Sequence, residues 1–300
     1  MSNSVEQNLR QAASDLLGVK AGLVAKGVDV PYGTPSSEYG QMIEDIQSGA
    51  KLNSTFNIES GVLTKGKISV DGELTLTIPD GVTEIGEGAF ENNAGIELIT
   101  ALNIPNSVTH IGKTAFCGCI NLRNLVIPNS VTSIDVSAFY DCRALTELTI
   151  PNSVEIIGPY AFRGCNALIS LTIPDSVTSI GVRTFYGCNA LTELTIPDSV
   201  TSIDQYAFDG CNALTELTIP DSVTSIGTYA FRGCNALTFL SIPNSVTSIG
   251  NDAFSGCYAL TDIYYSGTEE EWNAINGISN AGFKGTETIH YNYTGDGSKL

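Results

Sequence analysis

Residues 191–211 read LTELTIPDSVTSIDQYAFDGC, and close copies of this stretch recur along most of the chain. The Ile-Pro step inside it returns every 23 residues from Ile104 to Ile242, and an earlier copy at Ile78 precedes that series by 26 residues. Self-similarity with a period of this length is typical of a solenoid, in which each unit is one turn stacked on its neighbours. The fold is therefore decided by the repeat.

Within one unit, Leu194 and Ile196 alternate with threonines, which predicts a short strand. Pro197 ends that strand because it has no N–H to donate to a hydrogen bond with a neighbouring strand. Phe208 and Cys211 follow on the far side of the coil. One unit buries about six apolar side chains at ~1.5–3 kcal/mol each. Ordering its backbone costs more, at ~1–2 kcal/mol per residue, so stacking must supply the rest. We expect a β-rich solenoid with one short parallel strand per 23-residue unit.

The Leu-x-x-Leu-x-Ile-Pro, Val-x-x-Ile-Gly and Ala-Phe-x-Gly-Cys elements resemble the BspA-like, Treponema-type leucine-rich repeat over about residues 74–265. The resemblance implies a leucine-rich repeat solenoid. BspA-like proteins of bacteria and protists normally reach a cell surface through a secretion signal. The first 25 residues here lack the basic, apolar and small-residue pattern of such a signal.

The repeat pattern divides the chain into a solenoid over residues 78–265 and caps on either side. Residues 51–77 alternate apolar and polar side chains around glycines, which predicts an N-terminal β cap of short hairpins. Residues 266–300 predict a C-terminal cap. In it, Thr268 and Glu271 form a capping box that opens a short helix. A last strand is expected around Ile289, Tyr291 and Tyr293, within the same C-terminal range.

Residues 1–50 lie outside the repeat and predict a small helical anchor or oligomerisation segment. Apolar residues three and four apart indicate one amphipathic helix, and a second helix follows a turn. Two such helices are too small to be stable alone, so the segment is expected to form a dimer or trimer or to dock on a larger partner. The candidate anchor face is Val5, Leu9, Leu16, Leu23, Tyr39, Met42, Ile43 and Ile46.

Residues 26–43 read KGVDVPYGTPSSEYGQMI, which resembles a short segment of structural proteins of tailed bacteriophages. That resemblance implies a virion component. Such a component needs no secretion signal, because it assembles in the host cytoplasm and is released by lysis.

The overall charge excludes several classes of partner. The chain has 14 basic and 32 acidic residues and a formal net charge of −18. Nucleic-acid binding needs clustered Lys and Arg, so no nucleic acid is expected. No apolar run approaches the ~20 residues that span a bilayer, and no membrane association is expected.

The cysteines, histidines and Asn/Asp residues predict no catalytic site, metal site or cofactor site. Seven cysteines, from Cys119 to Cys257, occupy the same position in successive repeat units, and such a set of equivalent positions is called a column here. In-register thiols in one column suit a buried ladder better than disulfides. The pair Cys117 and Cys119 has no nearby histidine to complete a zinc site. The two histidines, His110 and His290, lie in ordinary repeat or cap positions. The Asn/Asp residues that follow the prolines are turn formers.

Two columns of the repeat vary most between units, and they bring tyrosine and arginine together. The first variable column, two residues before each Phe, holds Thr114, Ser137, Tyr160, Arg183, Tyr206, Tyr229 and Asp252. The second, just after the Phe, holds Cys117, Tyr140, Arg163, Tyr186, Asp209, Arg232 and Ser255. Tyr and Arg are enriched in binding hot spots, although they also serve as solvated spacers over a core. The candidate ligand-binding residues, named here the Tyr/Arg stripe, are Tyr140, Tyr160, Arg163, Arg183, Tyr186, Tyr206, Tyr229 and Arg232.

Together these features predict a non-enzymatic surface protein of a tailed-phage virion, of fibre or decoration type. Residues 1–50 would contact other virion proteins, and the solenoid would present the Tyr/Arg stripe to a host-surface protein or glycan. The alternative is a bacterial cell-surface or secreted BspA-like adhesin. A further alternative is an intracellular scaffold protein.

Overall fold

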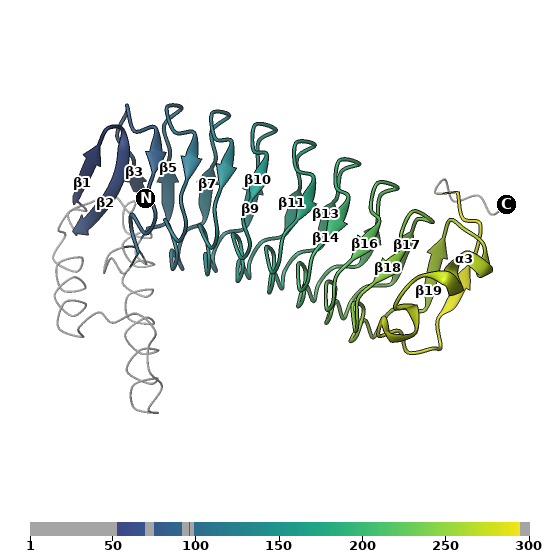
Figure 1. The fold of residues 1–300 in the computed structure, drawn as a ribbon. Helices are drawn as coiled ribbons and strands as arrows, with labels where there is room; N and C mark the ends of the chain where they lie inside the picture. The colour runs from purple at the N-terminus through teal and green to yellow at the C-terminus, as the bar shows by residue number, and fades with distance from the viewer. Residues whose placement is uncertain (1–52, 70–74, 92–95, 97–98, 295–300) are drawn as a thin grey trace, which may run out of the picture.

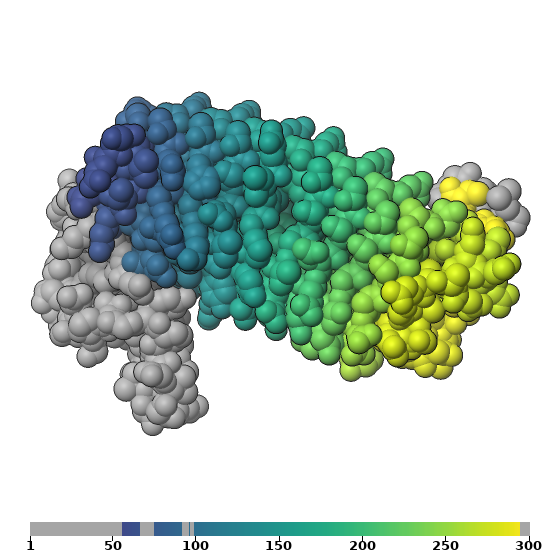
Figure 2. Space-filling view, viewed as in Figure 1, coloured from purple at the N-terminus to yellow at the C-terminus, as the bar shows by residue number. Residues whose placement is uncertain are grey.

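The computed structural model describes residues 53–69, 75–91, 96 and 99–294. Within these ranges the chain forms one row of stacked coils, closed by a hairpin at one end and a small mixed cap at the other (Figure 1). A space-filling view shows the coils as successive bands along an elongated body (Figure 2). The solenoid expected from the repeat is confirmed.

The first row of strands is formed by the Leu-x-Ile segment of each unit. These strands pair in parallel and in register, so that Leu171 lies between Leu148 and Leu194. They form a six-stranded sheet, β3 to β13, and a four-stranded sheet, β15 to β20. Their bounds are β3 Thr75–Thr77, β5 Ala101–Asn103, β7 Asn124–Val126, β9 Glu147–Thr149, β11 Ser170–Thr172, β13 Glu193–Thr195, β15 Glu216–Thr218, β17 Phe239–Ile242, β19 Asp262–Tyr265 and β20 Thr288–His290.

A second row, which the sequence did not predict, runs along another side of the coil. Each unit adds a two-residue strand at its Ser-Ile step, and Ile203 pairs with Ile180 and Ile226. The isoleucine faces the core, and the residue before it faces solvent to varying degrees. Their bounds are β4 Glu84–Ile85, β6 His110–Ile111, β8 Ser133–Ile134, β10 Ile156–Ile157, β12 Ser179–Ile180, β14 Ser202–Ile203, β16 Ser225–Ile226 and β18 Ser248–Ile249.

The core contains a continuous ladder of phenylalanines. From Phe90 to Phe254, each ring stacks on the ring of the next coil, with centroids 5.3–5.7 Å apart and planes within 16° of parallel. All eight rings are fully buried. Because each such pair adds ~0.5–1.5 kcal/mol beyond burial, the ladder ties each coil to its neighbours.

The cysteine column lies beside this ladder, and its seven thiols are buried without disulfides. From Cys142 onward, each Sγ donates to the carbonyl oxygen of a Phe in the preceding coil, at 3.5–3.8 Å. Burial raises the pKa of Cys188 to about 12. The expected thiol ladder is confirmed.

The N-terminal end is covered by an antiparallel hairpin of β1, Asn53–Glu59, and β2, Val62–Ser69. Phe56 closes the phenylalanine ladder edge-on, with its centroid 6.3 Å from that of Phe90. A Cβ on Gly66 would lie 1.9 Å from the Phe90 ring. Only glycine fits between the hairpin and the first coil.

The C-terminal end is closed by helix α3, Glu269–Ala274, a 3₁₀ turn η2, Ile278–Asn280, and strand β20. Thr268 and Glu271 form the predicted capping box, and Trp272 is buried. Strand β20 ends at His290, earlier than expected, and Asn292 adopts a left-handed φ of 57° that takes the chain out of extended geometry.

Two features are absent from the described residues. No helix there combines the length and hydropathy needed to cross a bilayer. In the same ranges, no group of three or more His, Cys, Asp or Glu side chains is arranged to hold a metal ion.

Candidate functional site

The first variable column has an unusual backbone conformation. Its seven residues, which are not glycine, all have φ between 53° and 61°, in the left-handed region. These residues are Thr114, Ser137, Tyr160, Arg183, Tyr206, Tyr229 and Asp252. The first unit has Gly88 in the same place, with φ of 59°. The turn therefore demands a left-handed residue whichever side chain it carries.

The demand comes from hydrogen bonds between coils. The N–H of Tyr206 donates to the carbonyl of Thr228 in the next coil at 3.0 Å, and its own carbonyl accepts from the N–H of Asp209 at 3.3 Å. Tyr160, Arg183 and Tyr229 make the same inter-coil bond at 3.0–3.1 Å. A left-handed conformation costs a residue with a Cβ roughly 1–2 kcal/mol relative to glycine. The tyrosines and the arginine of this column are held in place against that cost.

In the second variable column, Arg163 lies between two tyrosines. Its Cζ is 5.1 Å from the ring centroid of Tyr140 in the coil before it and 4.9 Å from that of Tyr186 in the coil after it. The ring of Tyr160, from the first column, lies 5.9 Å away. Each contact is a cation–π interaction, worth about 0.5–1 kcal/mol at a partly exposed site. Three rings thus surround one guanidinium.

The first column continues the same arrangement. The Cζ of Arg183 is 5.7 Å from the centroid of Tyr160 and 4.2 Å from that of Tyr206, and its Nη1 donates to the Tyr160 hydroxyl at 3.0 Å. The Tyr206 ring then stacks on Tyr229 with centroids 4.9 Å apart. Arg232, from the second column, contacts the ring of Tyr229 at 4.7 Å. All eight members of the Tyr/Arg stripe therefore join one set of ring contacts.

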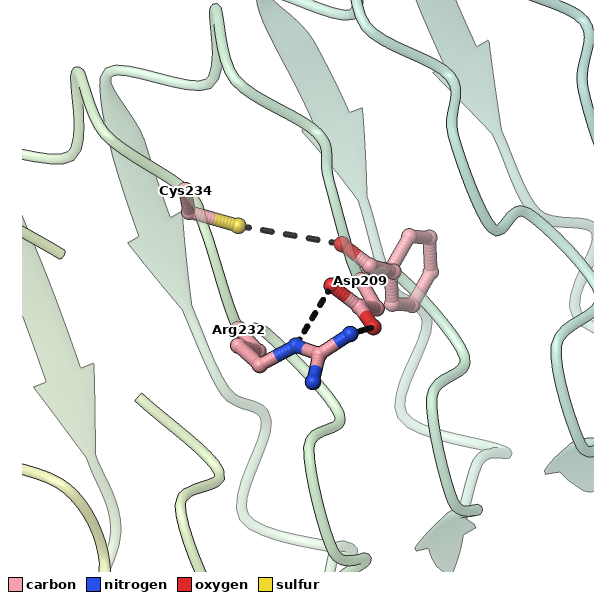
Figure 3. A network of polar contacts seen from close by, with 4 residues as sticks. Asp209, Arg232 and Cys234 are labelled. Atoms are coloured by element: carbon pink, nitrogen blue, oxygen red, sulfur yellow. Dashed lines mark hydrogen bonds and ion pairs between the residues drawn. The ribbon is translucent and has the colours of Figure 1, made fainter. Parts of the chain in front are cut away.

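Arg232 differs from the other two arginines because it has a carboxylate partner. Its Nη2 donates to Oδ2 of Asp209 at 2.7 Å and its Nε to Oδ1 at 3.2 Å (Figure 3). The Asp209 side chain is almost completely buried and that of Arg232 is about two-fifths exposed. Burial raises the pKa of Asp209, and the charges of Arg232 and Arg183 offset part of that rise. The hydrogen bond with Asp209 is the main cause of the raised pKa of Arg232.

The eight stripe residues are all half-buried, so each presents part of its side chain to solvent. Their interleaving follows from the repeat: residues 23 apart lie in adjacent coils, and an arginine stands between two tyrosines at Tyr160–Arg183–Tyr206 and at Tyr140–Arg163–Tyr186. The sequence named these residues but did not predict their mutual contacts. The residues proposed as an anchor face, Val5, Leu9, Leu16, Leu23, Tyr39, Met42, Ile43 and Ile46, lie outside the described residues.

Two further features were not predicted. The first is the pairing of Asp209 with Arg232, which a 23-residue separation between opposite charges in one column would have revealed. The second is an aromatic cluster on the first strand row near the C-terminal cap. There Tyr264 stacks on Phe239 and on His290, with centroids 4.9 and 4.7 Å away, and Tyr293 lies against both Phe239 and Tyr264.

The two histidines have local partners. The Nε2 atom of His290 lies 2.7 Å from Oδ1 of Asp262, and Nδ1 of His110 contacts the Ser133 hydroxyl of the next coil. Both contacts follow the stacking of neighbouring coils. Neither histidine belongs to the Tyr/Arg stripe.

Comparison with solved structures finds several leucine-rich repeat proteins. One, from Bacteroides ovatus, has 26% identity over 80% of this chain and 74% of its own, with a TM-score of 0.48. A leucine rich cell surface protein from Faecalibacterium prausnitzii has 24% identity over 74% of this chain and 96% of its own, with a TM-score of 0.45. A T. pallidum leucine rich repeat protein has 22% identity over 77% and 94%, with a TM-score of 0.46. No curated protein sequence matches the chain.

The repeat itself matches a family model described as the BspA type leucine rich repeat region. The matched stretches are residues 72–169, 94–212 and 155–290, which together span most of the chain. They include every member of the Tyr/Arg stripe. The chain belongs to the BspA-type leucine-rich repeat family.

Proposed function

We propose that this chain is a non-enzymatic binding protein displayed on a bacterial cell surface, and that the Tyr/Arg stripe contacts its ligand. The ligand is a protein or a glycan on the surface to which the bacterium attaches. The repeat supplies a rigid row of coils, and the stripe supplies side chains that are already held in position.

The observation that carries the proposal is the left-handed first column. The first unit satisfies the same turn with Gly88, yet the central units place Tyr160, Arg183, Tyr206 and Tyr229 there. Large side chains kept at a glycine-favouring position, half exposed and packed against one another, are better explained by ligand binding than by the needs of the coil.

Membership of the BspA-type family supports the surface-protein alternative over the virion reading. The family match begins at residue 72 and does not reach residues 1–50, on which the virion reading rests. Those residues also lie outside the described ranges. Attachment and self-association through residues 1–50 remain predictions, and nothing in the fold or in the comparisons supports a virion location.

Location is tested on intact cells of the bacterium that encodes the chain. Antibodies raised against residues 99–294 should label unpermeabilised cells, and brief protease treatment of those cells should remove the label. Labelling only after permeabilisation would favour the intracellular scaffold and contradict the proposal.

Binding is tested with an array that carries neutral glycans, acidic glycans and extracellular-matrix proteins. The triple variant Tyr140→Ser, Arg163→Ser and Tyr186→Ser should lose binding to the array components that the wild type recognises. The matched control is Glu147→Ser, Glu193→Ser and Glu216→Ser, three exposed positions on the first strand row. Equal binding by both triple variants would remove the stripe from the proposal.

A further inference from the structure

Arg163 is the most distinctive residue of the Tyr/Arg stripe. Its guanidinium is surrounded by the rings of Tyr140, Tyr160 and Tyr186. Among the described residues, no carboxylate pairs with it and no oxygen accepts its N–H groups. A half-buried guanidinium with five donors and no acceptor is prepared for an external acceptor.

Two other arginines of the chain do pair with a carboxylate. Arg143 pairs with Asp141 at 2.8 Å in the preceding coil, and Arg232 pairs with Asp209. The chain carries 32 acidic residues against 14 basic ones, so carboxylates are abundant. Arg163 and Arg183, in adjacent coils, nevertheless contact tyrosine side chains, and no carboxylate among the described residues forms an ion pair with either.

The chemistry of this pair favours a carboxylate ligand. A guanidinium binds a carboxylate through two parallel hydrogen bonds, and these are stronger than bonds between neutral groups. The surrounding rings hold the Arg163 side chain in place, so less side-chain entropy is lost on binding. Two guanidiniums in adjacent coils, with phenol groups between them, form a local positive site on an acidic protein.

The surroundings limit what can carry that carboxylate. Neither variable column contains an aliphatic side chain, so the stripe presents hydroxyl groups, ring faces and guanidiniums rather than an apolar pocket. A formal net charge of −18 repels a densely charged polyanion. A sugar with an isolated carboxylate suits this polar surface and this net charge, because its hydroxyl groups can bond to the tyrosine hydroxyls and it brings one negative charge.

We propose that Arg163 and Arg183 bind the carboxylate of an acidic sugar residue within an otherwise neutral glycan. This inference rests on the proposed function and names the ligand class of the same stripe. The carboxylate approaches Arg163 between the tyrosine rings, and the tyrosine hydroxyls contact the sugar hydroxyls.

Isothermal titration calorimetry of the full chain tests the ligand class with pairs of defined probes. Sialyllactose and lactose differ by one carboxylate-bearing sugar, and a glucuronic-acid disaccharide beside cellobiose separates uronic from sialic acids. We expect saturable binding of at least one acidic sugar and none of its neutral counterpart. A pentaglutamate peptide provides carboxylates without a sugar, and binding of that peptide in place of the sugars would overturn the assignment.

Variants of single arginines test the residue. Arg163→Gln should weaken acidic-sugar binding about tenfold or more, since a charge-assisted pair is lost. Arg163→Lys should be weakened as well, because an ammonium group has no planar fork. Arg143→Gln, one coil away, should bind like wild type.

An equal loss in Arg143→Gln and Arg163→Gln would contradict the assignment. So would a failure of the acidic sugars to bind while the Tyr140, Arg163 and Tyr186 triple variant still loses array binding. In that second outcome the proposed function survives and the ligand class falls.

Discussion

Phe162 and Arg163 are neighbours in the chain, yet their columns behave in opposite ways. The Phe162 column keeps the same residue in every unit from Phe90 to Phe254, fully buried and stacked ring on ring. The Arg163 column changes in almost every unit, and from Cys117 to Ser255 its members are half-buried except for the buried Asp209. Both columns contribute one residue to each coil. The comparison separates the side chains that build the solenoid from those that are left to vary.

The interior half of this comparison predicts the largest effect. Phe208→Ala removes a ring stacked on both Phe185 and Phe231 and leaves a cavity that closely stacked coils cannot fill. We expect a loss of about 3–5 kcal/mol in the free energy of unfolding. Urea denaturation measures it, with Phe208→Leu as the milder control. A loss below about 1 kcal/mol would show that the ladder does not hold the coils together.

A substitution at the N-terminal end of the phenylalanine ladder should cause a somewhat smaller loss in the free energy of unfolding. Gly66→Ala places a Cβ against the Phe90 ring and forces the hairpin away from the first coil. Overpacking of this kind costs about 1–3 kcal/mol. Because the contact is local, hydrogen exchange should speed up first at residues 53–69 and 75–91 and less in the central coils. Exchange that stays at the wild-type rate at the N-terminal end would exclude a capping role for the hairpin.

The buried thiol column predicts that the free energy of unfolding falls at alkaline pH. Burial raises the pKa of Cys188 from about 9 to about 12, so the folded state keeps a proton that the unfolded state releases above pH 9. The contribution of this thiol to the free energy of unfolding is fully present below pH 9 and is lost as the pH rises towards 12. Between pH 8 and pH 10 the loss from Cys188 is about 1 kcal/mol.

The measurement compares wild type with Cys188→Ala by urea denaturation at both pH values. The variant should lose about 1 kcal/mol less than wild type over this interval. Equal losses in the two proteins would mean that Cys188 ionises normally in the folded state.

A substitution in the left-handed first column should have the smallest effect on the free energy of unfolding, and it should be a gain rather than a loss. Ser137 has φ of 55° where the first unit has Gly88, and it lies outside the Tyr/Arg stripe. Ser137→Gly relieves the backbone strain but adds freedom to the unfolded chain, so we expect a gain of a few tenths of a kcal/mol up to about 1 kcal/mol. Ser170→Gly, in a strand with ordinary geometry, is the control and should be destabilising. A loss at Ser137 would show that the turn imposes no strain there.

Much of this molecule could be predicted from its sequence because the repeat compares the chain with itself. The strand at Leu194, the buried Phe208 and the thiol ladder follow from spacing alone. The second strand row was missed, because a two-residue step such as Ser202–Ile203 is too short to show a period. The left-handed φ was missed because Tyr206 gives no local signal of it, although Gly88 in the same column does.

The contacts within the site could not be predicted from the sequence for a different reason. The sequence places Tyr140, Arg163 and Tyr186 in successive coils, but their ring distances depend on how each side chain leaves the turn. Asp209 also looked like one more variable surface residue, whereas its carboxylate is buried against Arg232. Column membership predicted which residues are neighbours, and it did not predict which of them pair.

The most direct measurement is the free energy of unfolding of Phe162→Ala beside that of Arg163→Ala, both by urea denaturation of the full chain. We expect a loss of about 3–5 kcal/mol for Phe162→Ala and a smaller loss, at most about 1.5–3 kcal/mol, for Arg163→Ala, which removes three partly exposed cation–π contacts. Comparable losses at the two positions would mean that the Tyr/Arg stripe holds the coils together, and the division between scaffold and binding surface would be wrong.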